Sequence, residues 1–356
     1  MQPFVYVGQP CRVVFGPGTA ATLKEEIAAL GCRRALFCCT PGRAGAVTTF
    51  AAAVGDVGIG VCALAGPFTP IDAVSEGRRI ARERGADCLV SYGGGNAVGF
   101  AKAIALELDI PIVAVATTYA GSETTALQGI RYADGRRNHS SPRMLPRTVI
   151  YDPMLTIDLP LAVSIPSGIH AMAHAVGSFF AKNNNPVTAL MAEEGIRVMA
   201  VALPRIADEP ADTDARGDAL YGAWLCGSTL MSSSTVLHHK ICHVLAGDFG
   251  LTHAETNCIV LPHATAYNRA AAPDAMRRIA RAFGDESRDA PHALFDLLAR
   301  SGAPTALKNI GMKQNGLDRA ADLIMTNPYY NPRPYERAAI RSLLDDAWHG
   351  RPPAEP

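Results

Sequence analysis

Histidines recur at a helical spacing in the second half of the chain. His170 and His174 are four residues apart, as are His239 and His243, and His253 follows a Gly-Leu-Thr turn. Residues i and i+4 lie on one face of a helix, one turn apart. Two such faces turned toward each other would gather imidazoles that could hold a divalent metal ion or handle a proton beside a carbonyl group. The spacing alone is compatible with both kinds of chemistry.

Two residues next to this pattern have open interpretations. His238 directly precedes His239, so on a helix it faces about 100° away, and we expect a structural or supporting role for it. Lys240 is either a cation that binds a substrate carboxylate or a solvated side chain.

A glycine run in the first half of the chain is placed where a phosphate could bind. It follows the apolar run Cys88–Tyr92 and opens the helical pattern Ala97–Leu108, and it consists of Gly93, Gly94, Gly95 and Asn96. Backbone N–H groups at a helix N-terminus, unobstructed by Cβ atoms, can meet a pyrophosphate. The alternative is a plain tight turn. The G-x-G-x-x-G spacing of the usual dinucleotide fingerprint is absent.

Hydroxyl side chains follow the next apolar run, Ile112–Ala116. They belong to the segment Thr117–Glu123, and the residues that we expect to contact a cofactor there are Thr117, Thr118, Tyr119 and Ser122. Ligands of open α/β sheets bind at the carboxyl ends of the strands. The alternative is a capped loop that only closes a strand–helix unit.

The elements that would position these residues change in character along the chain. The first half alternates short apolar runs with amphipathic stretches, which favours βαβ units and a parallel sheet covered on both faces. The predicted strands are Ala35–Cys39, Gly60–Leu64, Cys88–Tyr92 and Ile112–Ala116, and the clearest helices are Asp72–Arg84 and Ala97–Leu108. Phe4–Val7 and Arg12–Phe15 are predicted to form an edge hairpin.

From about residue 151 onward the pattern is helical and almost free of β-branched runs. The predicted helices are Val187–Leu203, Ala215–Ser232, Asp274–Phe283 and Pro291–Leu298. We therefore expect an α/β nucleotide-binding domain over residues 1–158 and an all-α domain over residues 159–356.

The composition excludes several classes of protein. Lys and Arg number 33, as do Asp and Glu, so no net charge favours nucleic acid or an anionic membrane surface. No apolar run reaches the roughly 18 residues of a membrane span, and the first residues lack the features of a signal peptide. The nine cysteines show no CxxC or zinc-finger spacing, which indicates reduced thiols in a cytoplasmic protein.

Taken together, the motifs resemble the iron-containing (group III) alcohol dehydrogenase family, and within it the maleylacetate reductase subgroup. The resemblance covers essentially the whole chain. Beyond the glycine and threonine motifs and the histidine segments, it is carried by Phe15–Gly18, Leu145–Pro153, Asn185-Pro186, Met191–Gly195 and Asn331–Pro334.

The resemblance implies a dinucleotide-binding domain followed by a helical catalytic domain. Metal-dependent members of the family bind iron or zinc through one aspartate and three histidines. By position, the aspartate falls on His170 and the histidines fall on His174, His239 and His253. A further family histidine, near the nicotinamide and active in proton transfer, falls on His243.

Histidine at position 170 departs from the metal-dependent pattern. A bound M²⁺ would lose its only anionic protein ligand, although four imidazoles could still hold zinc and, less well, iron. Maleylacetate reductases commonly lack that aspartate, so the resemblance implies that metal is not required. Two further departures from the family pattern, at Gly177 and in the stretch Thr124–Asn138, leave the substrate open.

Cofactor choice depends on the end of the first predicted strand. NAD-specific relatives often carry an aspartate where this chain has Thr40, and Arg43 follows shortly after. Thr40 carries no charge to repel a 2′-phosphate. We therefore expect NADH to be used and NADPH not to be excluded.

The leading hypothesis is reduction of the conjugated double bond of maleylacetate, a 4-oxo-2-enedioate, to 3-oxoadipate in aromatic-compound degradation. His243 is the expected proton donor, and His174, His239, His253 and Lys240 are expected to orient the anionic oxo-acid. The alternatives are a metal-dependent alcohol or aldehyde oxidoreductase, and a diverged paralogue that acts on another oxo-acid or has lost catalysis. The resemblance also implies a homodimer.

Overall fold

The computed structural model describes residues 3–8, 11–232 and 234–355 of the chain. It divides into two compact units, which are described separately below. One unit spans Gly8–Leu159, and the other combines Pro160–Pro356 with the first residues, Met1–Val7.

The first unit is built around a parallel sheet. Its order along the sheet is β1-β8-β5-β4-β2-β3, and every pairing in it is parallel. The strands are β1 (Arg12–Phe15), β2 (Ala35–Cys38), β3 (Gly58–Cys62), β4 (Cys88–Gly93), β5 (Ile112–Ala116) and β8 (Thr148–Tyr151). The helices between them are α1 (Leu23–Ala29), α2 (Ala44–Ala53), α3 (Ile71–Glu83) and α4 (Gly95–Leu108).

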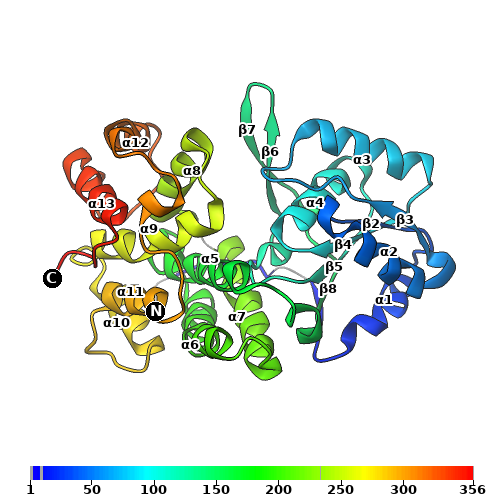
Figure 1. The fold of residues 1–356 in the computed structure, drawn as a ribbon, viewed down its shortest axis with the longest axis horizontal. Coiled ribbons are helices and arrows are strands. Elements are labelled where there is room, and N and C mark those ends of the chain that lie inside the picture. Colours follow the sequence, from blue (N-terminus) through cyan, green and yellow to red (C-terminus); the bar gives the residue numbers. More distant parts are fainter. Residues whose placement is uncertain (1–2, 9–10, 233, 356) are drawn as a thin grey trace. The chain divides into compact units, whose positions relative to one another are not determined.

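Both faces of this sheet are buried, as the continuous apolar runs predicted. Successive side chains of a strand point to opposite faces. Phe37 therefore joins a core with Ile27 of α1 and Val47 of α2, whereas Leu36 joins a second core with helices α3 and α4. Figure 1 shows α1 and α2 on one side of the strands and α3 and α4 on the other. The sheet thus forms the middle of three layers.

The strand order reverses between β2 and β4. The chain moves outward from β2 to β3, then crosses back so that β4 pairs with the other side of β2. In open parallel sheets, the crevice outside the carboxyl ends of the strands at such a reversal is the usual ligand site. Thr40 follows β2 and the glycine run follows β4, so both predicted cofactor motifs lie at this point of the sheet.

The prediction of an N-terminal hairpin was wrong. Arg12–Phe15 forms β1, but it pairs in parallel with β8, Arg12 opposite Thr148 and Phe15 opposite Tyr151. Phe4–Val7 is extended chain outside any strand and belongs to the helical unit. The two segments were assigned to each other because they are adjacent in sequence. The partner that satisfies the backbone of β1 lies more than a hundred residues away.

A second, two-stranded sheet occupies the stretch that departs from the family pattern. β6 (Leu127–Tyr132) and β7 (Gly135–Ser140) pair antiparallel across a tight turn. Ile130 is fully buried and belongs to the core on the α3 and α4 face, whereas β7 is largely exposed. The segment is therefore a hairpin anchored on one strand.

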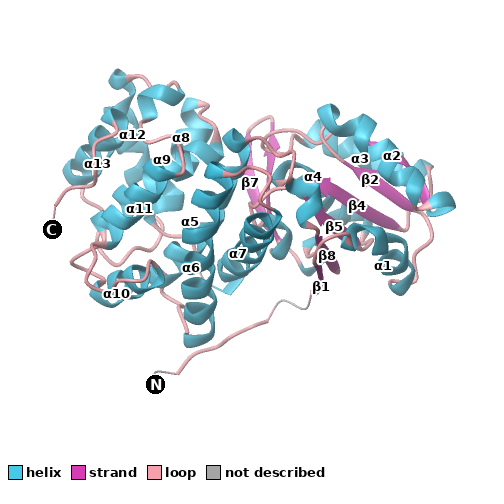
Figure 2. Cartoon of the chain, turned by 60° about the horizontal axis from the view of Figure 1, so that its bottom comes forward, coloured by secondary structure: helices cyan, strands magenta, loops and turns pink. Residues whose placement is uncertain are grey.

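The second unit is entirely helical, as predicted (Figure 2). Its helices are α5 (Leu161–Phe180), α6 (Pro186–Asp208), α7 (Thr213–Ser232), α8 (Leu237–Phe249), α9 (His253–Tyr267), α10 (Pro273–Ala282), α11 (Ala290–Arg300), α12 (Leu317–Met325) and α13 (Arg337–His349). In the described parts of the chain, no helix is both long and apolar enough to cross a bilayer.

Small residues let the long helices of this unit approach closely. A Cβ atom on Gly168 of α5 would lie 2.6 Å from Leu203 of α6, and one on Gly195 of α6 would lie 2.6 Å from the sulfur of Cys226 in α7. Such distances are below van der Waals contact, so a larger residue at either position would force its neighbour to shift. Helix α5, which carries the first histidine pair, is thereby held tightly against its neighbours.

Asp152 offers a direct test of how the sheet edge is closed. Its buried carboxylate accepts hydrogen bonds from the backbone N–H groups of Gly18, Ala20 and Met154, each at 3.0 Å. Asp152→Ala would leave three donors unsatisfied, so we expect the free energy of unfolding to fall by about 3 kcal/mol. Chemical denaturation measures this. Asp158→Ala, at an exposed position nearby, is the control, and equal stabilities of the two variants would contradict the assignment.

Candidate active site

The predicted histidines lie together in the helical unit. His170 and His174 are one turn apart on α5, His239 and His243 are one turn apart on α8, and His253 opens α9. Helix α9 packs against both α5 and α8. The shared helical face of each pair is what lets residues far apart in sequence meet.

The five imidazoles form a closed ring of neighbours. Within α5, the ring centroids of His170 and His174 are 4.9 Å apart, and within α8, those of His239 and His243 are 6.2 Å apart. The helices are joined by His174–His239 at 5.3 Å, His243–His253 at 5.9 Å and His170–His253 at 5.1 Å. We call this set the histidine ring.

The histidine ring has a buried floor and a more accessible rim. His174 and His239 are buried, whereas His170, His243 and His253 are partly exposed. A ligand would therefore reach the rim first, and the floor would close the site beneath it.

Burial keeps three of these imidazoles neutral. Desolvation lowers the pKa of His170 to about 4. It also lowers the pKa values of His174 and His239 well below the ordinary histidine value, and neighbouring histidines lower both further. At neutral pH the floor therefore offers neutral N–H donors and nitrogen acceptors in place of positive charges.

The floor has hydrogen-bonding capacity to spare. Among the described residues, neither ring nitrogen of His239 has a hydrogen-bond partner, and the Nδ1 atom of His174 has none either. A buried polar group without a partner costs about 1–3 kcal/mol, and natural proteins tolerate this mainly at functional sites. The arrangement is that of a site for a polar ligand.

His238 has a different position from its neighbours, as helix geometry predicted. Its Nε2 atom lies 3.2 Å from the carbonyl oxygen of Asn257 on α9 and 3.6 Å from the sulfur of Cys242. It thus ties α8 to α9 and supports the ring from outside.

Tyr329 was not identified from the sequence. Its hydroxyl shares a hydrogen bond of 3.0 Å with Nδ1 of His243, and the Nζ atom of Lys240 lies 5.8 Å from the centroid of its ring. Lys240 is itself only partly exposed, and burial lowers its pKa. Its ammonium group is therefore part of the surroundings of His243, which favours a role at the site over a solvated side chain.

A signal for Tyr329 was present in the sequence. It lies two residues before Asn331, which belongs to a motif that the family resemblance singled out. The amides of Asn331 and Asn268 bond reciprocally at 2.6 and 3.0 Å, which attaches this segment to the end of α9. The motif therefore positions the tyrosine.

The histidine ring is not arranged as a ready metal site. Over the described residues, no three Asp, Glu, His or Cys side chains are arranged so that they could hold one. The four predicted ligands, His170, His174, His239 and His253, lie in one ring, but no three of them form such a group. They also lack the anionic ligand that iron prefers.

The first unit presents an open cradle at the start of α4. Gly94 caps the helix and Gly95 begins it. A Cβ atom on Gly94 would lie 2.6 Å from the Thr118 side chain, whereas one on Gly95 would meet nothing within 4 Å. Gly93 has φ of 145°, which favours glycine. The backbone at Gly95 is thus accessible, and the residues of this cradle fit the pyrophosphate of a dinucleotide.

The other predicted cofactor residues differ in their contacts with this cradle and in their exposure to solvent. The backbone N–H of Thr117 donates to the carbonyl of Gly93 at 3.2 Å. Thr118 and Ser122 are partly exposed and Asn96 is exposed, whereas Tyr119 is fully buried in the core of the unit. Thr40, beyond the end of β2, is partly exposed.

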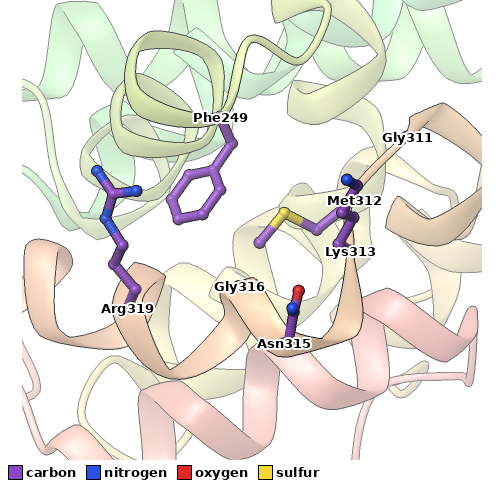
Figure 3. Close-up of a pocket in the computed structure, with 7 residues that line it drawn as sticks. All are labelled: Phe249, Gly311, Met312, Lys313, Asn315, Gly316 and Arg319. Atoms are coloured by element: carbon purple, nitrogen blue, oxygen red, sulfur yellow. The ribbon is translucent and has the colours of Figure 1, made fainter.

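A cavity of about 340 Å³ lies elsewhere in the helical unit (Figure 3). Phe249 and Met312 face each other across it, and Arg319 lies on one side with its guanidinium 5.5 Å from the Phe249 ring centroid. None of the residues predicted from the sequence lines it, so it is separate from the histidine ring.

Comparison with known families identifies the class. Residues 10–153 match iron-containing alcohol dehydrogenase, and residues 164–348 match the C-terminal part of the Fe-containing alcohol dehydrogenase family. The chain therefore belongs to the iron-containing alcohol dehydrogenase family and is an oxidoreductase, as the sequence motifs predicted.

More closely similar proteins carry a narrower name. A maleylacetate reductase of Burkholderia cepacia is 48% identical over 99% of this chain and 100% of its own. The crystal structure of maleylacetate reductase from Rhizobium sp. strain MTP-10005 has a TM-score of 0.94 at 44% identity, covering 99% of this chain and all of that one. A putative alcohol dehydrogenase from Ralstonia eutropha JMP134 has a TM-score of 0.97 at 50% identity, with the same coverage.

Proposed function

We propose that this chain reduces the conjugated carbon–carbon double bond of maleylacetate to give 3-oxoadipate, using NADH. Full-length similarity to maleylacetate reductases supports the substrate. The single structural observation that carries the proposal is the closed ring of five imidazoles, with histidine at position 170.

The reaction requires hydrogen-bond donors from the protein at the ketone oxygen of the substrate. When bound, the reduced nicotinamide supplies a hydride to the carbon β to the ketone. Negative charge then develops on the ketone oxygen as an enolate, and the α carbon afterwards takes a proton. Preorganised N–H and O–H donors stabilise such charge most strongly where water is excluded, as at the buried floor of the histidine ring.

His243 is the proposed proton donor. It is partly exposed on the rim, and its hydrogen bond with Tyr329 fixes its ring orientation. That bond also offers a path by which the tyrosine hydroxyl can return a proton to the imidazole after each turnover.

The remaining ring members and Lys240 would hold the two carboxylates of the substrate. The unpartnered nitrogens of His174 and His239 can donate to carboxylate oxygens. Lys240 supplies the nearby positive charge that neutral imidazoles lack. His253, between His170 and His243 in the ring, would orient the oxo group.

We propose that the dinucleotide binds at the glycine cradle of the first unit, with the pyrophosphate on the backbone of Gly95. Thr40 and Arg43 lie just beyond β2, at the strand-order reversal. Since neither is acidic, a 2′-phosphate meets no repulsion there, and NADPH should be accepted beside NADH.

We further propose that catalysis needs no metal. The ring lacks an anionic ligand, and no three of its members are arranged to hold a metal ion, whereas its N–H groups can stabilise an enolate directly. The second candidate is a metal-dependent alcohol or aldehyde oxidoreductase. It is favoured by the family's iron-containing members and by the unpartnered nitrogens of His174 and His239, which are also the kind of donor that a metal takes.

His243→Ala tests the proposed chemistry. We expect kcat for NADH oxidation with maleylacetate to fall by about 100-fold or more, the range for loss of a general acid. Tyr329→Phe should lower kcat by about 10-fold, since it leaves the imidazole in place. His349→Ala, on α13 outside the ring, is the control.

The same assay tests the substrate class. The wild-type chain should oxidise NADH with maleylacetate and turn over simple aldehydes poorly. Near-normal rates in His243→Ala would remove this residue from its proposed role. Efficient turnover of aldehydes without any of maleylacetate would favour the second candidate.

Gly95→Ala tests the cradle. Its Cβ would point into open space, so the free energy of unfolding should stay the same or rise slightly, because alanine favours the helix. The methyl group would nevertheless stand where the pyrophosphate binds, so Kd for NADH should rise by about 10-fold or more. Titration of nicotinamide fluorescence measures Kd. Gly247→Ala, also with an open Cβ position, is the control, and an unchanged Kd in Gly95→Ala would place the dinucleotide elsewhere.

A further inference from the structure

A lysine is completely buried on the helix that opens with the glycine cradle. Lys102 of α4 has no exposed surface. The residues on either side of it in the sequence are small or apolar, so it is a charged residue within a buried stretch. Its Nζ atom donates to the carbonyl oxygens of Ser122 at 2.6 Å and Leu127 at 3.2 Å, and to the hydroxyl of Thr125 at 2.8 Å. All three acceptors belong to one segment, which we call the 117–127 loop.

These acceptors match an ammonium group. A charged lysine has three N–H donors, and a neutral amine has only two and a lone pair. The Thr125 hydroxyl donates its own hydrogen to the Ser122 carbonyl at 3.0 Å, so its oxygen is left to accept from Lys102. Each N–H of the ammonium thus has one oxygen in the same loop.

A buried carboxylate balances the charge. Glu123 lies in the same loop and is 2% exposed, and the hydroxyl of Tyr151 on β8 donates to it at 2.8 Å. Burial lowers the pKa of Lys102 to about 7, and Glu123 opposes that shift. Burial of such groups is costly without mutual pairing and hydrogen bonds, so apolar side chains in place of both Lys102 and Glu123 would serve stability as well or better.

The loop also touches the cradle directly. Thr117 bonds to Gly93, and the side chain of Thr118 occupies the space over Gly94. Lys102 lies seven residues, or about two helical turns, after Gly95. Helix α4 therefore presents the cradle at its first turn. From its third turn, through Lys102, it holds the loop that covers the cradle.

We propose that Lys102 is a positioning residue for the dinucleotide. By fixing the 117–127 loop at Ser122, Thr125 and Leu127, it holds Thr118 and Ser122 against the ligand that the cradle binds, and so sets the affinity for NADH. The inference rests on the proposed function only in taking a dinucleotide as that ligand. It does not depend on the oxo-acid or on the histidine ring.

The test is direct binding of NADH, followed by nicotinamide fluorescence without oxo-acid. Lys102→Met keeps the length of the side chain and removes its donors, so Kd should rise by about 10-fold or more. Thr125→Val removes one of three acceptors and should raise Kd by about 3-fold. Lys24→Met, an exposed lysine of α1 in the same unit, should leave Kd unchanged.

A second measurement separates positioning from stability. In Lys102→Met, amide hydrogen exchange should accelerate in the 117–127 loop and stay unchanged in strands β2 and β4. In turnover, KM for NADH should rise while KM for the oxo-acid does not. If Lys102→Met fails to fold, Thr125→Val still provides both readouts.

The outcomes of these measurements distinguish a failure of the inference on Lys102 from a failure of the proposed function. Wild-type Kd in folded Lys102→Met, or in Thr125→Val if the first variant does not fold, overturns the inference even if the melting temperature falls. That result would leave the proposed function intact. A wild-type chain that binds no NADH overturns both.

Discussion

The site depends on five imidazoles packed around one another, with a buried floor and without a carboxylate at position 170. Desolvation makes charge expensive there, so His170, His174 and His239 stay neutral. Neutral imidazoles crowd together at 5–6 Å between centroids without repelling, which charged ones could not do. An aspartate at position 170 would reverse this balance, because it would favour cations and disfavour an anionic substrate.

Much of this could be read from the sequence because the relevant signals are local. The spacing of His170 with His174, and of His239 with His243, specifies a helical face, and the apolar run ahead of Gly93 specifies a buried strand that ends at a helix. Both local predictions agree with the helices and strands of the structure. The division into a parallel α/β unit and a helical unit followed from the same local periodicities.

The features that could not be predicted depend on contacts between residues far apart in the sequence. The pairing of β1 with β8 joins segments separated by more than a hundred residues, and no local pattern records it. Tyr329 lies 86 residues after His243, its hydrogen-bond partner. Lys102 looked like an ordinary helix residue. Its position among small and apolar neighbours was a usable signal, but the three acceptors that explain its burial appear only in the folded loop.

The central claim is that the histidine ring acts through its own N–H groups, in a family whose name specifies iron. It is tested most directly by turnover of maleylacetate with NADH before and after exhaustive chelation, with the metal content of the same samples measured. The expected rate per subunit is unchanged when metal falls well below one equivalent, and it is not raised when zinc or iron is restored. A rate that falls in proportion to the metal removed and returns with its addition would contradict it.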